Sequence, residues 1–131
     1  MRTIKFDSEE INVLKEIILL GNSQYDNDFP EISKLILSKI RIEIFHFPKK
    51  ELQVLRSYCS NWMNNNDVLI DELRKKYLGG NTIDYENISE EEIESLQKIN
   101  LVFSIKSKLF SEKYITFKNV LDKINKNYNE I

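Results

Sequence analysis

Apolar side chains recur every third or fourth position along most of the chain, the spacing that places them on one face of an α-helix. In residues 8–20 the stripe is formed by Ile11, Leu14, Ile17 and Ile18. The stripes and the turn-forming residues between them predict helices over residues 8–20, 30–41, 48–63, 67–78, 89–110 and 117–127. The sequence therefore predicts a mainly α protein, a compact bundle of about six helices.

One stretch departs from the helical spacing. Residues 40–47, IRIEIFHF, alternate apolar and polar side chains at first and are rich in β-branched residues, a pattern typical of a strand. Residues 2–6 and 113–117 carry weaker versions of it. The alternative fold is therefore α+β, with a small β ribbon of these three segments beside the helices.

A short phrase occurs three times: FDSEEINVLK from Phe6, FPKKELQVLR from Phe47 and ISEEEIESLQ from Ile88. Each copy starts 41 residues after the previous one. Each has the features of a helix start: an apolar residue, a capping position and a glutamate three residues after it. We expect reciprocal capping bonds between the cap and the glutamate in Asp7–Glu10 and in Ser89–Glu92. In the second copy the cap position holds a proline, which supplies no capping oxygen.

A chain of 131 residues is expected to form a single domain, residues 1–131, and the equal spacing suggests three related α-hairpins within it. The corresponding sub-units would be residues 1–46, 47–87 and 88–131. In each, the second helix ends in a basic–apolar pair. The pairs are Lys39-Ile40, Lys76-Tyr77 and Lys123-Ile124. Because these pairs fall at unequal offsets, similar helix starts without a shared origin remain the alternative.

Composition indicates a folded chain with a well-solvated surface: 41% of residues are apolar, 31% are charged, and the net charge is −2. Tyr58 and Trp62 lie on an apolar stripe and are expected in the core rather than at an interface. The single cysteine, Cys59, forms no internal disulfide. No apolar run reaches the length of a membrane span, and the first residues do not resemble a secretory signal. We therefore expect a cytoplasmic protein that does not enter a membrane.

No catalytic, metal-binding or cofactor-binding motif is present. His46 and Cys59 are the only histidine and cysteine, and two such ligands fall short of a zinc site. Nothing in the sequence requires them to be neighbours, as a catalytic pair would be. Gly79 and Gly80 lack the surroundings of a phosphate-binding loop. The sequence therefore predicts neither an enzyme nor a cofactor.

Residues 84–94 contain six acidic side chains and no lysine or arginine. Acids in the first turn of a helix interact favourably with the helix dipole, which accounts for Glu90, Glu91 and Glu92. It does not account for the others, so we interpret part of this segment as a surface that binds a basic partner. The predicted partner-binding residues are Asp84, Glu86, Glu90, Glu91 and Glu94.

Charge changes sign in the C-terminal segment, where residues 98–126 contain seven lysines and only two acids, Glu112 and Asp122. The sequence thus favours a non-enzymatic protein–protein interaction module, such as a small inhibitor, an immunity protein, an antitoxin or a phage accessory protein. Its expected partner is another protein with a basic surface; a second copy of the chain would form a homodimer. The alternative is a nucleic-acid-binding regulator that uses the lysine-rich helices.

Overall fold

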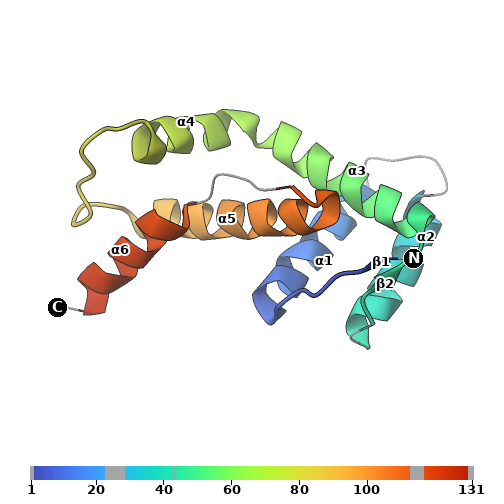
Figure 1. The fold of residues 1–131 in the computed structure, drawn as a ribbon. Helices are drawn as coiled ribbons and strands as arrows, with labels where there is room; N and C mark the ends of the chain where they lie inside the picture. The colour runs from blue at the N-terminus through green and yellow to red at the C-terminus, as the bar shows by residue number, and fades with distance from the viewer. Residues whose placement is uncertain (1, 23–28, 43, 113–116, 130–131) are drawn as a thin grey trace.

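The structure is a computed structural model that describes residues 2–22, 29–42, 44–112 and 117–129, and α-helices account for most of them (Figure 1). The helices are α1 (Ser8–Asn22), α2 (Phe29–Arg41), α3 (Lys49–Asn65), α4 (Asp67–Leu78), α5 (Glu90–Phe110) and α6 (Lys118–Asn129). Two short strands are β1 (Arg2–Thr3) and β2 (His46–Phe47). The predicted mainly α fold is confirmed, and the helix bounds lie close to those expected from the sequence.

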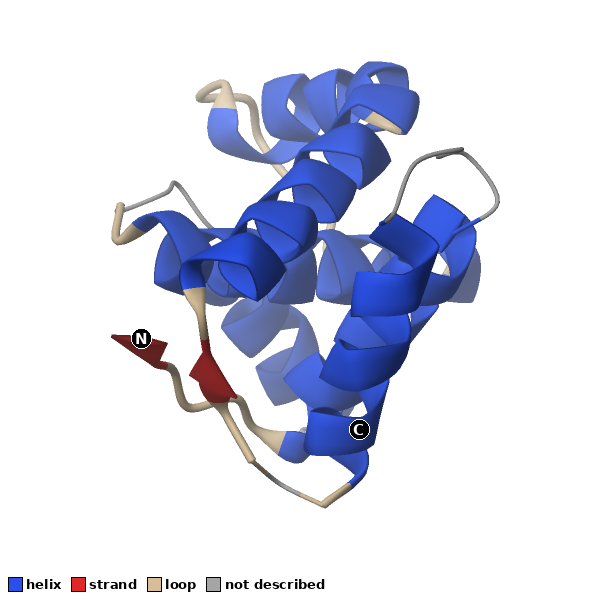
Figure 2. Ribbon diagram, turned by 90° about the vertical axis from the view of Figure 1, so that its right-hand side faces the viewer, coloured by secondary structure: helices blue, strands red, loops and turns tan. Residues whose placement is uncertain are grey.

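Helix α5 is the central element of the bundle. It packs against α1, α3 and α6. Figure 1 shows α3 and α4 crossing the top of the molecule, with α5 beneath them running in the opposite direction. Helices α1 and α2 lie toward one end of α5, and α6 lies toward the other end. Seen from the side in Figure 2, the short strands lie at the edge of the helical assembly.

The core is formed by the predicted apolar stripes. Leu14, Ile18 and Leu55 are fully buried, and Phe103 of α5 stacks on Phe117 with ring centroids 5.9 Å apart. Helix α5 also buries residues outside its predicted stripe, such as Val102. It does so because helices cover it on more than one side, so a single stripe underestimates its buried surface. Tyr58 and Trp62 are buried, as predicted.

The β ribbon is much smaller than the alternative fold would require. Arg2 pairs with Phe47 and Thr3 with His46 in an antiparallel arrangement. Residues 40 and 41 belong instead to the end of α2, and residues 113–116 lie outside the described residues. The ribbon stays short because the helical stripe of α2 continues into the predicted strand. Phe6 then packs against Phe47 of β2, with ring centroids 6.5 Å apart.

The second predicted hairpin does not form. Helices α1, α3 and α5 do start at the predicted interval of 41 residues, and each is followed by a shorter helix. However, Asn66 alone separates α3 from α4, and the two helices continue as one bent rod (Figure 1). The Asn66 side chain donates to Trp62 O at 2.8 Å, which closes the end of α3 without reversing the chain.

The predicted capping boxes are only partly confirmed. Asp7 N–H donates to Glu10 Oε1 at 3.0 Å, and Glu10 N–H donates to Asp7 Oδ1 at 2.8 Å, so the first box is complete. Pro48 makes no side-chain cap, as expected. Ser89 Oγ accepts a hydrogen bond from Glu92 N–H at 3.2 Å. The reciprocal bond, from Ser89 N–H to the Glu92 carboxylate, is not formed among the described residues. That carboxylate is engaged by a lysine of α4, as described below.

Candidate partner-binding surface

The loop between α4 and α5 is held together by Asp84. Its Oδ1 accepts a hydrogen bond from Glu86 N–H at 3.3 Å, and its Oδ2 accepts one from Asn87 Nδ2 at 2.6 Å. Asn87 N–H also donates to the Asp84 carbonyl oxygen at 3.3 Å. The Asp84 carboxylate is therefore engaged within its own turn. Both predicted loop acids are exposed, but only Glu86 has a carboxylate that forms no hydrogen bond or ion pair with a described residue.

Helix α5 begins with three consecutive glutamates in different environments. The Glu92 side chain is 22% exposed, and its carboxylate accepts hydrogen bonds from Lys76 Nζ at 2.9 and 3.0 Å. The other glutamates in the first two turns are Glu90, Glu91 and Glu94. All three are exposed and form no ion pair with any described residue.

The ion pair between Glu92 and Lys76 is a closed local unit. Partial burial acts to raise the pKa of Glu92, but the Lys76 ammonium group and the neighbouring Tyr77 hydroxyl together outweigh it, and the pKa lies below its ordinary value. Burial, and then the negative charge of Glu92, raise the pKa of the adjacent Tyr77 hydroxyl. At neutral pH the carboxylate is ionised and the phenol protonated. Lys76 is thus occupied and does not neutralise the exposed glutamates nearby.

A hollow of about 510 Å³ lies between α4 and the start of α5. Glu72 of α4 and Glu91 of α5 line it, and both are exposed. Within the described part of the chain, Glu72 has no ion-pair partner. The predicted set did not include Glu72, because its place beside the acidic segment depends on how α4 packs against α5. The acidic surface therefore spans two helices.

A second hollow, of about 440 Å³, continues from the first and shares Leu69 and Ser95 with it. Its walls come from α1, α3, α4 and α5. Trp62, which is 8% exposed, lines it together with Leu20 and Leu69, which are 49% and 39% exposed. The two hollows together are called the α4–α5 groove below. Sequence reasoning placed Trp62 in the core and missed that it also faces this groove.

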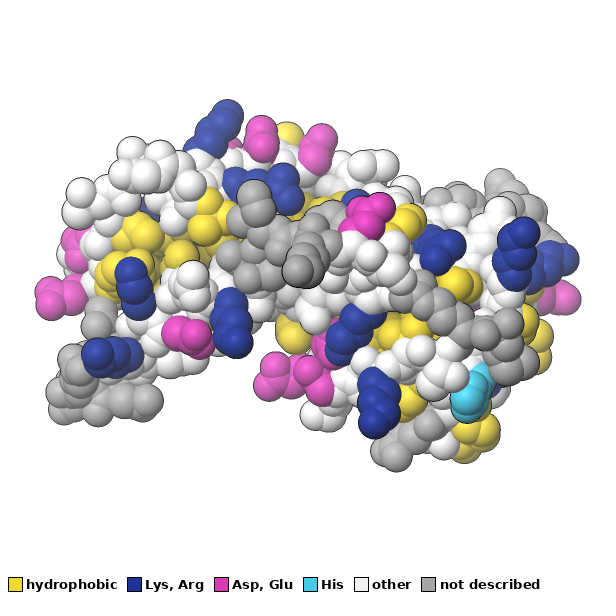
Figure 3. Space-filling model, viewed as in Figure 1, with side chains coloured by type: hydrophobic (Ala, Val, Ile, Leu, Met, Phe, Trp, Pro, Cys, Tyr) yellow, Lys and Arg dark blue, Asp and Glu magenta, His cyan; other side chains and the backbone are white. Residues whose placement is uncertain are grey.

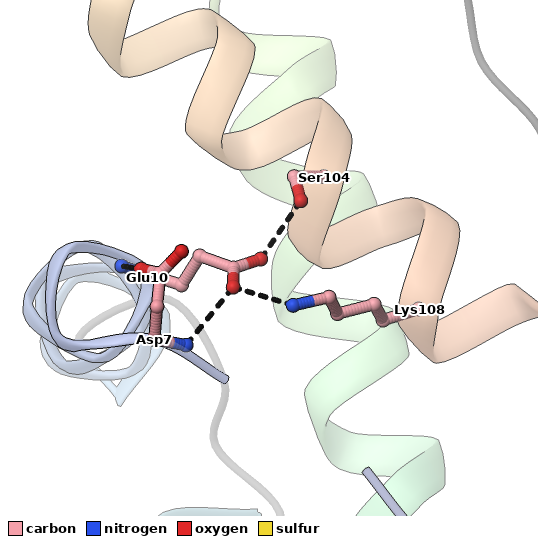
Figure 4. A network of polar contacts seen from close by, with 4 residues as sticks. All are labelled: Asp7, Glu10, Ser104 and Lys108. Atoms are coloured by element: carbon pink, nitrogen blue, oxygen red, sulfur yellow. Dashed lines mark hydrogen bonds and ion pairs between the residues drawn. The ribbon is translucent and has the colours of Figure 1, made fainter. Parts of the chain in front are cut away.

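Other glutamates have structural roles, and Glu10 is the most buried of them at 1% exposure. Its Oε1 lies 2.5 Å from Lys108 Nζ, and its Oε2 accepts from Ser104 Oγ at 2.8 Å (Figure 4). The same carboxylate accepts the capping bond from Asp7 N–H. Figure 4 shows these partners converging on it from the start of α1 and from α5. Glu10 thus joins two helices as well as capping one.

The glutamates equivalent to Glu10 in the other two copies of the phrase are also paired with lysines. Lys39 Nζ lies 2.7 Å from the buried carboxylate of Glu51, and Lys76 pairs with Glu92 as described above. Each of these lysines belongs to a predicted basic–apolar pair and lies in the last turn of the preceding helix, α2 or α4. The glutamate three residues after the cap position is therefore accounted for by the fold in all three helix starts.

Several lysines of the C-terminal segment are engaged within the fold. Lys98 and Lys108 pair with glutamates of α1, and Lys123 lies 5.9 Å from the centroid of the Tyr85 ring. Lys113 lies outside the described residues. Figure 3 shows basic side chains scattered among acidic and apolar ones over the face in view. The arrangement gives no support to the nucleic-acid alternative, which remains a prediction.

No known protein-family model matches the chain, and comparisons with curated proteins and with solved structures found no match. Among the described helices, none is both long and apolar enough to cross a bilayer. The described residues also contain no cluster of three His, Cys, Asp or Glu side chains arranged to hold a metal ion. Cys59 is fully buried, whereas His46 is exposed on β2 beside Thr3.

Proposed function

We propose that this chain is a non-enzymatic, cytoplasmic interaction module that binds a basic surface of another protein through the acidic start of α5 and the neighbouring Glu72 of α4. The surface is made by Glu72, Glu86, Glu90, Glu91 and Glu94. A small inhibitor, immunity protein, antitoxin or phage accessory protein would work in this way, by covering a basic surface that its target needs. The acidic side chains supply complementarity, and the helices hold them in place.

The observation that carries this proposal is that these carboxylates have no partner among the described residues. Neighbouring acids are used by the fold: Glu92 holds Lys76, and Asp84 closes a turn. Like charges gathered at one end of the molecule cost stability through mutual repulsion. Binding a basic surface would relieve that repulsion, speed the encounter of the two proteins and make their affinity depend on salt.

The test is a triple charge reversal, Glu90→Lys, Glu91→Lys and Glu94→Lys, in the full chain. The matched control reverses three exposed acids elsewhere, Glu9, Glu31 and Asp122, of which the first two also lie in first helical turns. Both variants change the net charge equally and remove favourable interactions with helix dipoles. A difference in affinity between them therefore reports on the proposed surface and not on the net charge.

Capture from a lysate of the native host, with mass-spectrometric identification, gives the partner, and titration of the purified pair gives its affinity. We expect the site variant to bind the partner at least about tenfold more weakly at low salt, and the control to bind within about twofold. Both should melt near the temperature of the unchanged chain. Equal affinity of the site variant and the control would refute the proposed surface.

A further inference from the structure

We infer that the α4–α5 groove docks an amphipathic helix of the partner that carries lysine or arginine beside its apolar stripe. This inference rests on the proposed function and adds the form of the partner's binding element. The geometry combines an apolar floor with an acidic rim, and both parts are needed to specify such a helix.

The floor of the groove holds a firmly packed apolar patch, bordered by the polar residues Asn61, Asn65 and Asn66. Trp62 and Ile99 line it and are nearly buried, whereas Leu20 and Leu69 leave large parts of their side chains exposed to water. Gly21 helps to shape it, because a Cβ at this position would lie 2.5 Å from the Tyr58 ring. Helix α1 can therefore lie directly against that ring. The result is a preformed apolar surface rather than a gap that must first open.

The rim of the groove carries unneutralised negative charge. Glu72 and Glu91 line the end near the start of α5, and neither pairs with a described cation. The two lysines of the groove are already engaged: Lys76 pairs with Glu92, and Lys98 pairs with Glu16 at 2.6 Å. The charge left for an incoming segment is therefore negative, and it favours a basic one.

The walls of the groove favour a helix over an extended strand. All the secondary-structure elements that line it are helices, so it offers no sheet edge to which a strand could add. Along α5 the lining runs from Ser89 to Ile99, which at 1.5 Å per residue is roughly 15 Å. That length accommodates about three turns of helix, enough for apolar anchors at positions i, i+3, i+4 and i+7.

Trp62 is the only tryptophan of the chain, so its fluorescence reports directly on the groove. The probes are three synthetic helical peptides without tryptophan, each about fourteen residues long. The first has leucines at i, i+3, i+4 and i+7 with lysines elsewhere. The second has the same composition with the leucines scattered, and the third replaces every lysine with glutamate. Each is titrated into the full chain at low salt.

We expect the first peptide to give a saturable change in Trp62 fluorescence and to bind at least about tenfold more tightly than the other two. Leu20→Asn and Leu69→Asn should each weaken it about tenfold. Leu35→Asn, which changes a leucine of α2 that is 60% exposed, should leave its binding unchanged. Because the three substituted positions are exposed, we expect the variants to fold, and melting curves establish that they do.

Equal binding of the striped and scattered peptides, or no saturable binding below about 1 mM, would overturn the inference. So would a concentration-dependent dimer that Leu69→Asn dissociates, because the occupant would then be a second copy of the chain. A different result would refute the proposed function: capture of the partner by the charge-reversed triple variant as well as by the control. A partner lost on charge reversal but retained by Leu20→Asn and Leu69→Asn would leave the acidic surface standing and remove the groove.

Discussion

Replacing Glu10 with glutamine should destabilise the protein strongly although it barely changes the side chain's size. The Glu10 side chain is almost fully buried, and its carboxylate receives donors from Asp7, Ser104 and Lys108. A glutamine has one acceptor oxygen and an NH₂ group in place of the second. The new NH₂ group would therefore face a donor, and the Lys108 ammonium group would lose its counter-charge.

The magnitude follows from the lost contacts. Hydrogen bonds to charged groups contribute about 1.5–3 kcal/mol each, and one such bond is lost while a second is weakened. We expect the free energy of unfolding to fall by about 2–4 kcal/mol, a large share of the 5–15 kcal/mol typical of a domain. With about 2.1 cal/mol/K of unfolding entropy per residue over 131 residues, Tm should fall by roughly 7–15 °C.

The matched control is Glu16→Gln on the same helix. Glu16 also pairs with a lysine of α5, Lys98, at 2.6 Å, but its side chain is 48% exposed. Solvent screens such a pair, so its loss should cost no more than about 1 kcal/mol. Urea unfolding followed by circular dichroism measures both variants. Similar losses of unfolding free energy in the two would refute the reasoning, because burial of Glu10 would then add nothing.

Three further outcomes follow from the structure. Gly21→Ala should lower Tm, because the roughly 1 kcal/mol gained in helix propensity is smaller than the cost of a Cβ 2.5 Å from the Tyr58 ring; a raised Tm would contradict this. Burial raises the pKa of the Cys59 thiol to about 12, so at pH 8 the folded protein should react with a thiol reagent far more slowly than the protein in urea. The lowered pKa of Glu92 stabilises the fold above the ordinary carboxyl pKa, and this contribution is lost as the pH falls through the folded value. Lys76→Met should therefore lower the free energy of unfolding at pH 7 but have little effect near pH 3, whereas an equal loss at both pH values would exclude this origin.

The helices could be predicted from the sequence because their causes are local. Apolar stripes of period 3.6 and caps such as Asp7 act within a few residues of the positions they fix. The pairing of Glu10 with Lys108 could not be predicted, because it depends on α1 crossing α5, far along the chain. The segments that contain β1 and β2 did show a strand pattern, but the two-residue length of their pairing could not be predicted, because tertiary contacts and the continuation of α2 set it.

The candidate surface was predictable in part for the same reason. The exposure of Glu90, Glu91 and Glu94 follows from their position on a helix start, although their binding role remains a proposal. Asp84 is exposed, but its second role could not be predicted, because a sequence does not reveal that a carboxylate will also close its own turn. Glu72 was missed because arginine and lysines follow it in sequence, and only packing places it across from Glu91.

Helix stability alone does not explain the acids at the start of α5. The helices α2, α3 and α4 each begin with one acidic residue in the first turn, and α6 has none among its described residues. Those starts form nonetheless, so the dipole does not require three acids in the first turn of α5 and a fourth, Glu94, in the second. Glu92 is accounted for by its ion pair with Lys76. What remains is Glu90, Glu91 and Glu94, whose charges repel one another and serve no described contact within the fold, and a basic partner supplies the compensation they lack.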